Sequence, residues 1–173
     1  MHFINPCNDT AFQVIDVIEP ELFLQLADSP FSVLAYVPGL SEEQRHALQA
    51  PNIHVSPQPV DMRYVTRHAK AILCHAGIGT VLHGLLAGLP LLLLPIQLEQ
   101  LLMARNVARI GMGICIDTGQ GVPDFSALLR ELVKNPQYAK NAQRFAHKYA
   151  DTKEDTLMAS VVQRCEELMS NRE

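Results

Sequence analysis

The chain has 173 residues, the usual size of one domain with a single substantial core. Its hydrophobic content of 48% and charged content of 18% exclude an intrinsically disordered protein, and a net charge of −4 argues against a nucleic-acid-binding surface. We therefore expect one domain over residues 1–173, in which residues 1–11 form a poorly structured lead-in.

Apolar strand-like runs alternate with helical patterns along most of the chain, which predicts βαβ units around a parallel sheet. The expected strands are 12–18, 32–37, 53–55, 71–74, 91–94 and 113–117. The expected helices are 20–27, 41–49, 62–68, 80–87, 98–110 and 124–133. Gly88 and Gly111 stand where two helices should end. The fold class is thus α/β, a Rossmann-like three-layer sandwich with about six parallel strands and helices on both faces.

After Pro136 the pattern becomes helical only, which predicts a C-terminal helical pair over 137–149 and 154–170. Apolar residues of the last helix recur at the i, i+3 and i+4 spacing of a single stripe. They are Leu157, Met158, Val161, Val162, Cys165, Leu168 and Met169. Either this stripe packs on the sheet as core, which is the simpler interpretation, or its face is bare and joins copies of the chain into a homo-oligomer.

No membrane span is expected, because the apolar run 84–96 is short and is interrupted by Pro90 and Pro95. The first residues do not resemble a secretory signal peptide. The four cysteines form no CxxC pair and lie at no zinc-ligand spacing, so we expect no metal site and a reducing, cytoplasmic environment.

The most informative stretch begins where the strand 71–74 ends in His75. Gly77 and Gly79 follow, and neither has a side chain that would keep a ligand from the backbone. The next helix should begin at about Thr80, and its unpaired N–H groups and dipole would favour an anion. The alternative is a tight strand-to-helix connection in which Thr80 only caps the helix.

The next strand, 91–94, ends in Pro95, with Glu99 and Gln100 shortly after it. Polar groups thus follow two successive strands, at the edge where open α/β sheets bind ligands. The combination of His75-Ala-Gly-Ile-Gly-Thr80 with Pro95-x-x-x-Glu99-Gln100 resembles the donor-site signature of UDP-glycosyltransferases of the two-domain GT-B fold. The likeness runs from about residue 31 to residue 117 and belongs to the C-terminal, donor-binding domain of that family.

The resemblance implies a role for each matching residue. His75, Gly77, Ile78, Gly79 and Thr80 would bind the diphosphate of a nucleotide sugar. Glu99 and Gln100 would hydrogen-bond the sugar hydroxyls. The donor would be a UDP- or TDP-hexose, which is a substrate, and no further cofactor is implied.

The resemblance also points to the loop before the helix 62–68 as the nucleobase site. Pro57, Gln58 and Val60 would contact the base, although a Pro-rich turn explains this segment equally well. The family often stacks the base on a tryptophan, and this chain has none. The chain also departs from the family near the end of the first strand, where relatives have a small-residue loop and this chain has Asp16 and Glu19. The carboxylate of Glu19 would repel a diphosphate.

Two functions follow from these residues. The first is a glycosyltransferase donor domain that transfers a hexose to a small-molecule or lipid acceptor. It would work with an N-terminal acceptor domain that is absent here or carried on another chain, as in the two-subunit N-acetylglucosaminyl transferases of dolichol assembly. The family takes its general base from that domain, so no catalytic residue is assignable in this chain. The second is a non-catalytic nucleotide-binding or interaction domain, a truncated relative.

Overall fold

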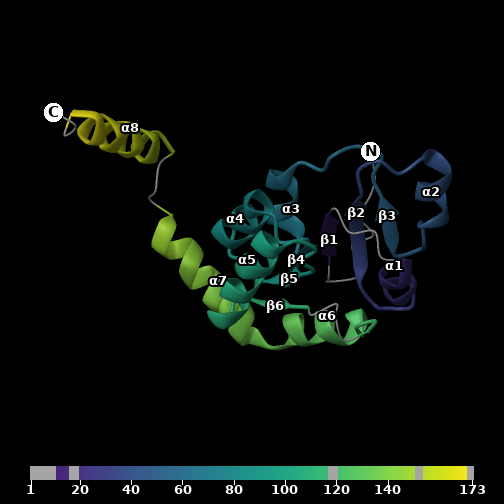
Figure 1. The fold of residues 1–173 in the computed structure, drawn as a ribbon. Helices are drawn as coiled ribbons and strands as arrows, with labels where there is room; N and C mark the ends of the chain where they lie inside the picture. Colours follow the sequence, from purple (N-terminus) through teal and green to yellow (C-terminus); the bar gives the residue numbers. More distant parts are fainter. Residues whose placement is uncertain (1–10, 16–19, 117–120, 151–153, 171–173) are drawn as a thin grey trace.

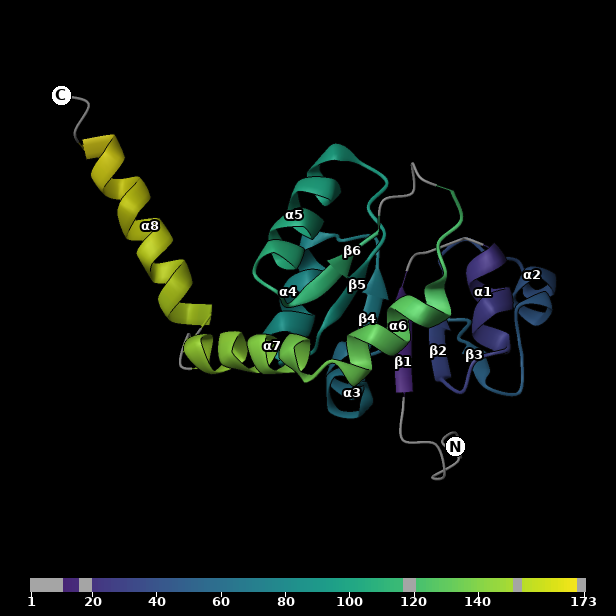
Figure 2. The ribbon, with the colours of Figure 1, turned by 90° about the horizontal axis from the view of Figure 1, so that it is seen from below.

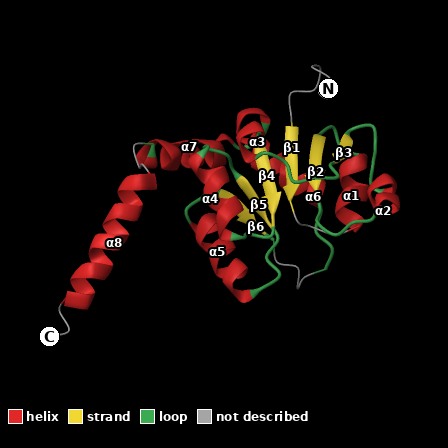
Figure 3. Ribbon diagram, turned by 90° about the horizontal axis from the view of Figure 1, so that it is seen from above, coloured by secondary structure: helices red, strands yellow, loops and turns green. Residues whose placement is uncertain are grey.

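The computed structural model describes residues 11–15, 20–116, 121–150 and 154–170. Within them lies a six-stranded parallel sheet of order β3-β2-β1-β4-β5-β6, whose arrows point the same way in Figure 3. Its strands are β1 Ala11–Ile15, β2 Ser32–Tyr36, β3 Ile53–Val55, β4 Ala71–Cys74, β5 Leu91–Leu93 and β6 Gly113–Cys115. The strand order reverses between β1 and β4. The predicted Rossmann-like sheet is confirmed.

Eight helices accompany the described strands. They are α1 Pro20–Ala27, α2 Glu42–Ala47, α3 Met62–His68, α4 Ile78–Leu86, α5 Leu98–Arg109, α6 Phe125–Lys134, α7 Pro136–Tyr149 and α8 Glu154–Ser170. Side chains of α1 and α6 pack in one core cluster, and side chains of α3, α4, α5 and α7 in another. The sheet lies between these two clusters, which gives the three layers seen in Figure 2.

The central strands are buried on both faces, which explains why they are continuous apolar runs. Within β4, Ala71 and Leu73 belong to the cluster of α1 and α6. Ile72 and Cys74 belong to the opposite cluster, because successive side chains of a strand point to opposite faces. All four residues are at most 2% exposed, so this strand is a rigid support for the turn that follows it.

Two helices end in the glycines that the sequence indicated. Gly88 and Gly111 have φ angles of 74° and 68°, the left-handed conformation that favours glycine. After α4, the Gly88 N–H donates to Leu85 O at 3.0 Å and the Leu89 N–H to Gly84 O at 2.9 Å. This pair of hydrogen bonds is a Schellman motif, and it satisfies carbonyls that the end of the helix would otherwise leave without donors.

The last helix does not pack on the sheet. Figures 1 and 2 show α8 extending away from the body of the domain beyond α7. Val162, Leu168 and Met169 are 52%, 53% and 75% exposed. The simpler interpretation of the apolar stripe, as core, is therefore wrong for the described part of α8, because no element of the domain lies close enough to bury it. The helix α7 does pack, through Ala142 in the cluster with α4 and α5.

Some predicted boundaries need correction. Ala11 belongs to β1 and pairs with Ser32 of β2, so the expected lead-in over 1–11 is wrong at its last residue. β1 is described as far as Ile15, and the predicted continuation to residue 18, like Asp16 and Glu19, lies outside the described residues. Among the helices of the described ranges, none combines the length and apolar character that a membrane crossing requires.

Candidate functional site

Two neighbouring strands bring the predicted donor-site segments to one edge of the sheet. Cys74 of β4 pairs with Leu93 of β5, and the Leu94 N–H donates to Cys74 O at 2.9 Å. The turn that begins at His75 therefore lies beside the segment that begins at Pro95. Both follow the carboxyl ends of their strands, next to the switch in strand order where open α/β sheets bind ligands.

The first segment is a short turn between β4 and α4. His75 is half-buried, and Ala76 is fully buried with a φ angle of 65°. The helix begins at Ile78, earlier than expected, and Gly77 is its N-cap. The alternative that Thr80 only caps the helix is wrong, because Thr80 lies within the first turn of α4.

The N-terminus of α4 has no side-chain cap, in contrast to several other helices. The side chains of Ser41, Asp61, Asp124 and Asn135 each accept a hydrogen bond from a first-turn N–H of their own helix. At α4 the N-cap is a glycine, which offers no acceptor. The first-turn N–H groups of α4 therefore face the sheet edge with no acceptor from their own N-cap residue, next to the positive end of the helix dipole.

The second segment forms the start of α5. Glu99 is exposed in the first turn. The Gln100 side chain folds back on its own helix, and its Oε1 atom accepts a hydrogen bond from the Ile96 N–H at 3.0 Å. In this arrangement the amide NH2 of Gln100 is left to donate to a ligand. The sequence offered no signal for this contact beyond the spacing of the two residues.

The predicted nucleobase loop follows β3, which is separated from β4 in the sheet by the two strands β2 and β1. The Ser56 hydroxyl orders this loop, since it donates to Gln58 O at 2.7 Å and accepts from the Gln58 N–H at 3.3 Å. Pro57 and Gln58 are exposed, whereas Val60 packs against the core cluster that also contains Ala76. The loop thus returns from the sheet edge toward the layer of α4.

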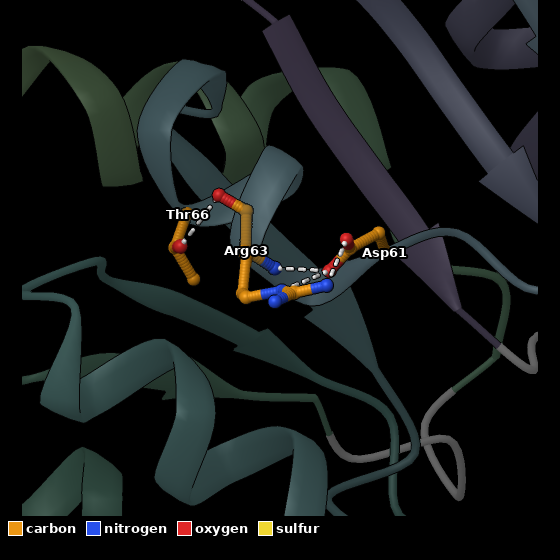
Figure 4. A network of polar contacts seen from close by, with 3 residues as sticks. All are labelled: Asp61, Arg63 and Thr66. Atoms are coloured by element: carbon orange, nitrogen blue, oxygen red, sulfur yellow. Dashed lines mark hydrogen bonds and ion pairs between the residues drawn. The ribbon is translucent and has the colours of Figure 1, made fainter.

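After this loop, α3 begins with an exposed ion pair. Asp61 caps the helix through the Arg63 N–H at 2.9 Å, and its Oδ2 atom lies 3.0 Å from Nη2 of Arg63 (Figure 4). These hydrogen bonds from Arg63 hold the pKa of the Asp61 carboxyl below its usual range. The same contact raises the pKa of Arg63. The positive charge of Arg63 is therefore paired with the Asp61 carboxylate at the start of α3.

In the described part of the chain, no three His, Cys, Asp or Glu side chains are grouped so that they could hold a metal ion. The site residues that the structure describes are instead suited to hydrogen bonding. They comprise backbone N–H groups at α4, an imidazole at His75, and a carboxylate and an amide at the start of α5.

Comparison with known proteins gives a family match over most of the chain. Residues 33–168 match the erythromycin biosynthesis protein CIII-like C-terminal domain. A Caenorhabditis elegans protein, provisionally named UDP-glucuronosyltransferase ugt-47, is 32% identical over 104 residues, which are 57% of this chain and 19% of that protein. The chain thus spans about a fifth of the length of this curated relative.

Solved structures share the fold. The calicheamicin glycosyltransferase CalG4 superposes with a TM-score of 0.77 at 22% identity, covering 94% of this chain and 45% of CalG4. The glycosyltransferase VinC, solved in complex with dTDP, gives a TM-score of 0.78 at 20% identity, covering 92% of this chain and 42% of VinC. At these identities the likeness establishes the fold, and this chain corresponds to less than half of either protein.

Proposed function

Because this chain belongs to the family of erythromycin biosynthesis protein CIII-like C-terminal domains, we propose that it is the donor-binding half of a glycosyltransferase. The donor is a nucleotide-diphosphate sugar, a UDP- or TDP-hexose. The acceptor is a small molecule or a lipid held by an N-terminal half, which belongs to the remainder of a longer chain or to a separate chain.

The observation that carries this proposal is the placement of Gly77 and Gly79. Neither glycine is required by the backbone, since Gly77 has a φ angle of −61° and Gly79 lies within α4. Neither is required by packing, since a Cβ atom at either position would meet no heavy atom within 4 Å. Glycine inside a helix is also less stable than alanine. The two glycines therefore leave open space beside backbone N–H groups, although glycine in the helix lowers its stability. Such space suits a ligand that approaches the backbone closely.

The chemistry follows from this placement. The acceptor hydroxyl attacks the anomeric carbon, the bond from that carbon to the diphosphate oxygen breaks, and the electron pair leaves with the diphosphate. First-turn N–H groups of α4 and the imidazole of His75 would stabilise the charge that grows on the leaving group. Glu99 and the NH2 group of Gln100 would hold the sugar hydroxyls, and Pro57, Gln58 and Val60 the base. The base that removes the acceptor proton comes from the other half.

Titration calorimetry with UDP, TDP and their glucose conjugates tests the diphosphate role. We expect binding at millimolar concentrations or tighter, and about tenfold weaker binding in His75→Ala, which corresponds to one lost charge-assisted hydrogen bond. His46→Ala is the matched control, because His46 is an exposed histidine on α2. No heat from any of the four compounds, or equal affinity in His75→Ala, would contradict the proposal.

Comparison of conjugates with bare nucleotides tests the sugar role separately. We expect UDP-glucose or TDP-glucose to bind more tightly than UDP or TDP, and Glu99→Ala to remove that difference while leaving the affinity for the bare nucleotide unchanged. Equal affinities in the parent chain would instead indicate a domain that binds only the nucleotide.

We also propose that the exposed apolar face of α8 contacts another polypeptide, namely the acceptor half where it is present and a second copy of this chain where it is not. Support comes from Val162, Leu168 and Met169, each more than half exposed along one helix.

We further propose a cytoplasmic location, because the cysteine spacing fits neither a disulfide framework nor zinc ligation. Fractionation of cells that express the chain tests the location.

A further inference from the structure

In the turn between β4 and α4, alanine stands at a position whose backbone conformation favours glycine, and glycine stands at positions where alanine would fit. Among the described residues, those with positive φ are glycines, namely Gly39, Gly88, Gly111 and Gly121, with Ala76 as the exception. Ala76 has a φ angle of 65°, in the left-handed region that disfavours a residue with a Cβ atom. The glycines on its C-terminal side, Gly77 and Gly79, lie where alanine would fit without strain.

The surroundings of Ala76 explain what its methyl group does. Ala76 is 0% exposed and belongs to the core cluster that contains Cys74 of β4 and Val81 and Leu85 of α4. Its methyl group is therefore packed into the layer between the sheet and α4. Glycine at this position would remove the backbone strain and the buried methyl group together, and these two effects on stability oppose each other and are similar in size. Glycine would also let the turn adopt many other conformations.

We propose that Ala76 is a positioning residue for the donor site. Its buried methyl group fixes the turn in a single strained conformation, and the turn in that conformation holds His75 and the first-turn N–H groups of α4 where the donor diphosphate binds. This inference rests on the proposed function, and it adds that the affinity for the donor depends on a residue whose own side chain is turned into the core and away from the ligand.

The test is Ala76→Gly, compared with Ala142→Gly as a matched control. Ala142 on α7 is also 0% exposed and belongs to the same cluster, but it lies in a regular helix. For Ala76→Gly we expect a Tm within about 3 °C of the parent and binding of UDP-glucose or TDP-glucose weakened about fivefold or more. For Ala142→Gly we expect the Tm to fall by about 4–8 °C and the affinity to stay within about twofold.

A second variant tests the methyl group itself. Ala76→Ser keeps the Cβ atom, so its affinity should stay within about twofold of the parent. The Val81 N–H donates to Gly77 O at 3.0 Å, and its hydrogen exchange should quicken in Ala76→Gly but not in Ala76→Ser. If the parent binds the conjugates and Ala76→Gly binds them equally well, the positioning role is overturned while the proposed function stands. A comparable loss of affinity in Ala76→Ser would also overturn it. If the parent binds none of them, the proposed function itself fails.

Discussion

The Oε1 atom of Gln100 accepts a hydrogen bond from the backbone N–H of Ile96 at 3.0 Å. This contact joins the residue before the N-cap of α5 to a side chain in the first turn of the helix. The N-cap residue, Gln97, makes no side-chain cap of its own. It also orients the amide of Gln100, whose NH2 group is left to donate to a sugar hydroxyl. One residue thus combines a structural contact with a proposed role in binding.

Two substitutions at Gln100 separate these roles. Gln100→Glu keeps an oxygen for the Ile96 N–H but has no NH2 group, so we expect an unchanged Tm and a smaller preference for UDP-glucose over UDP. Gln100→Ala removes both, so the Tm should also fall by about 1–3 °C, as expected for the loss of one partly exposed hydrogen bond. Thermal melts and calorimetry measure the two effects. Unchanged sugar preference in both variants would remove Gln100 from the donor site.

At Gly79 we expect stability and binding to change in opposite directions. Gly79→Ala should raise the free energy of unfolding by about 0.5–1 kcal/mol, because alanine is favoured in a helix and its Cβ atom meets open space. The same methyl group should weaken diphosphate binding about tenfold or more by blocking access to the backbone. Denaturant unfolding and titration with UDP check both effects.

Gly113→Ala serves as the contrast for Gly79→Ala. A Cβ atom at Gly113 would overlap the backbone oxygen of Leu91, so this variant should be destabilised. A Gly79→Ala protein that binds UDP like the parent would show that the open space at Gly79 does not serve a ligand.

Asn52 is expected to be a determinant of stability and not of binding. Its Nδ2 group donates to Leu26 O at 2.8 Å, Ser29 O at 3.1 Å and Phe31 O at 2.8 Å. Asn52→Ala removes these three part-buried hydrogen bonds, so the free energy of unfolding should fall by about 1–3 kcal/mol. Affinity for UDP, measured at a temperature where the variant is folded, should not change. An unchanged midpoint of urea unfolding would contradict this role.

The ion pair of Asp61 with Arg63 should make stability depend on pH at the acid end. Because the folded protein lowers the pKa of Asp61, the stabilisation is fully present above the unfolded pKa of about 4 and is lost as the pH falls through the lower folded value. Asp61→Asn retains a good helix cap without the charge. We expect the small Tm advantage of the parent over Asp61→Asn at pH 7 to disappear at about pH 2. A Tm difference that is the same at both pH values would show that the charge has no role.

For α8, sedimentation velocity tests the proposed contact between copies of the chain. If the apolar face joins two copies, the parent should sediment as a dimer at high concentration, and Val162→Glu combined with Leu168→Glu should return it to a monomer. Ala159→Glu is the control, because Ala159 is exposed on the polar side of the same helix. A parent that stays monomeric at high concentration would contradict the contact between copies.

Much of the fold could be predicted from short stretches of sequence. The buried strands β4 and β5 follow from their apolar runs, and the ends of α4 and α5 follow from Gly88 and Gly111. The adjacency of the His75 turn and the Glu99 segment followed from two successive parallel strands, which pair as expected. The start of α4 was placed too late, because a glycine N-cap at residue 77 gives no side-chain signal.

The apolar stripe of α8 shows where periodicity stops being informative. Its spacing correctly predicted an amphipathic helix, yet the described side chains are exposed, because nothing in a helical repeat says which surface will cover it. Similarly, the presence of alanine at position 76 gives no indication of a positive φ angle.

The sequence by itself determined the local structure of this chain: alternating strands and helices, helix ends, and two strand ends that carry the residues of the proposed donor site. These depend on a few consecutive residues, whose backbone preferences and periodicity act over one or two turns. Only the tertiary structure decided the strand order, the strained conformation of Ala76 and the contacts of Gln25, which accepts the Phe125 N–H at 2.7 Å and donates to Pro123 O at 3.0 Å. Such contacts join residues about a hundred positions apart, and they form only where the packing of α1 and α6 on one face of the sheet brings the two segments together.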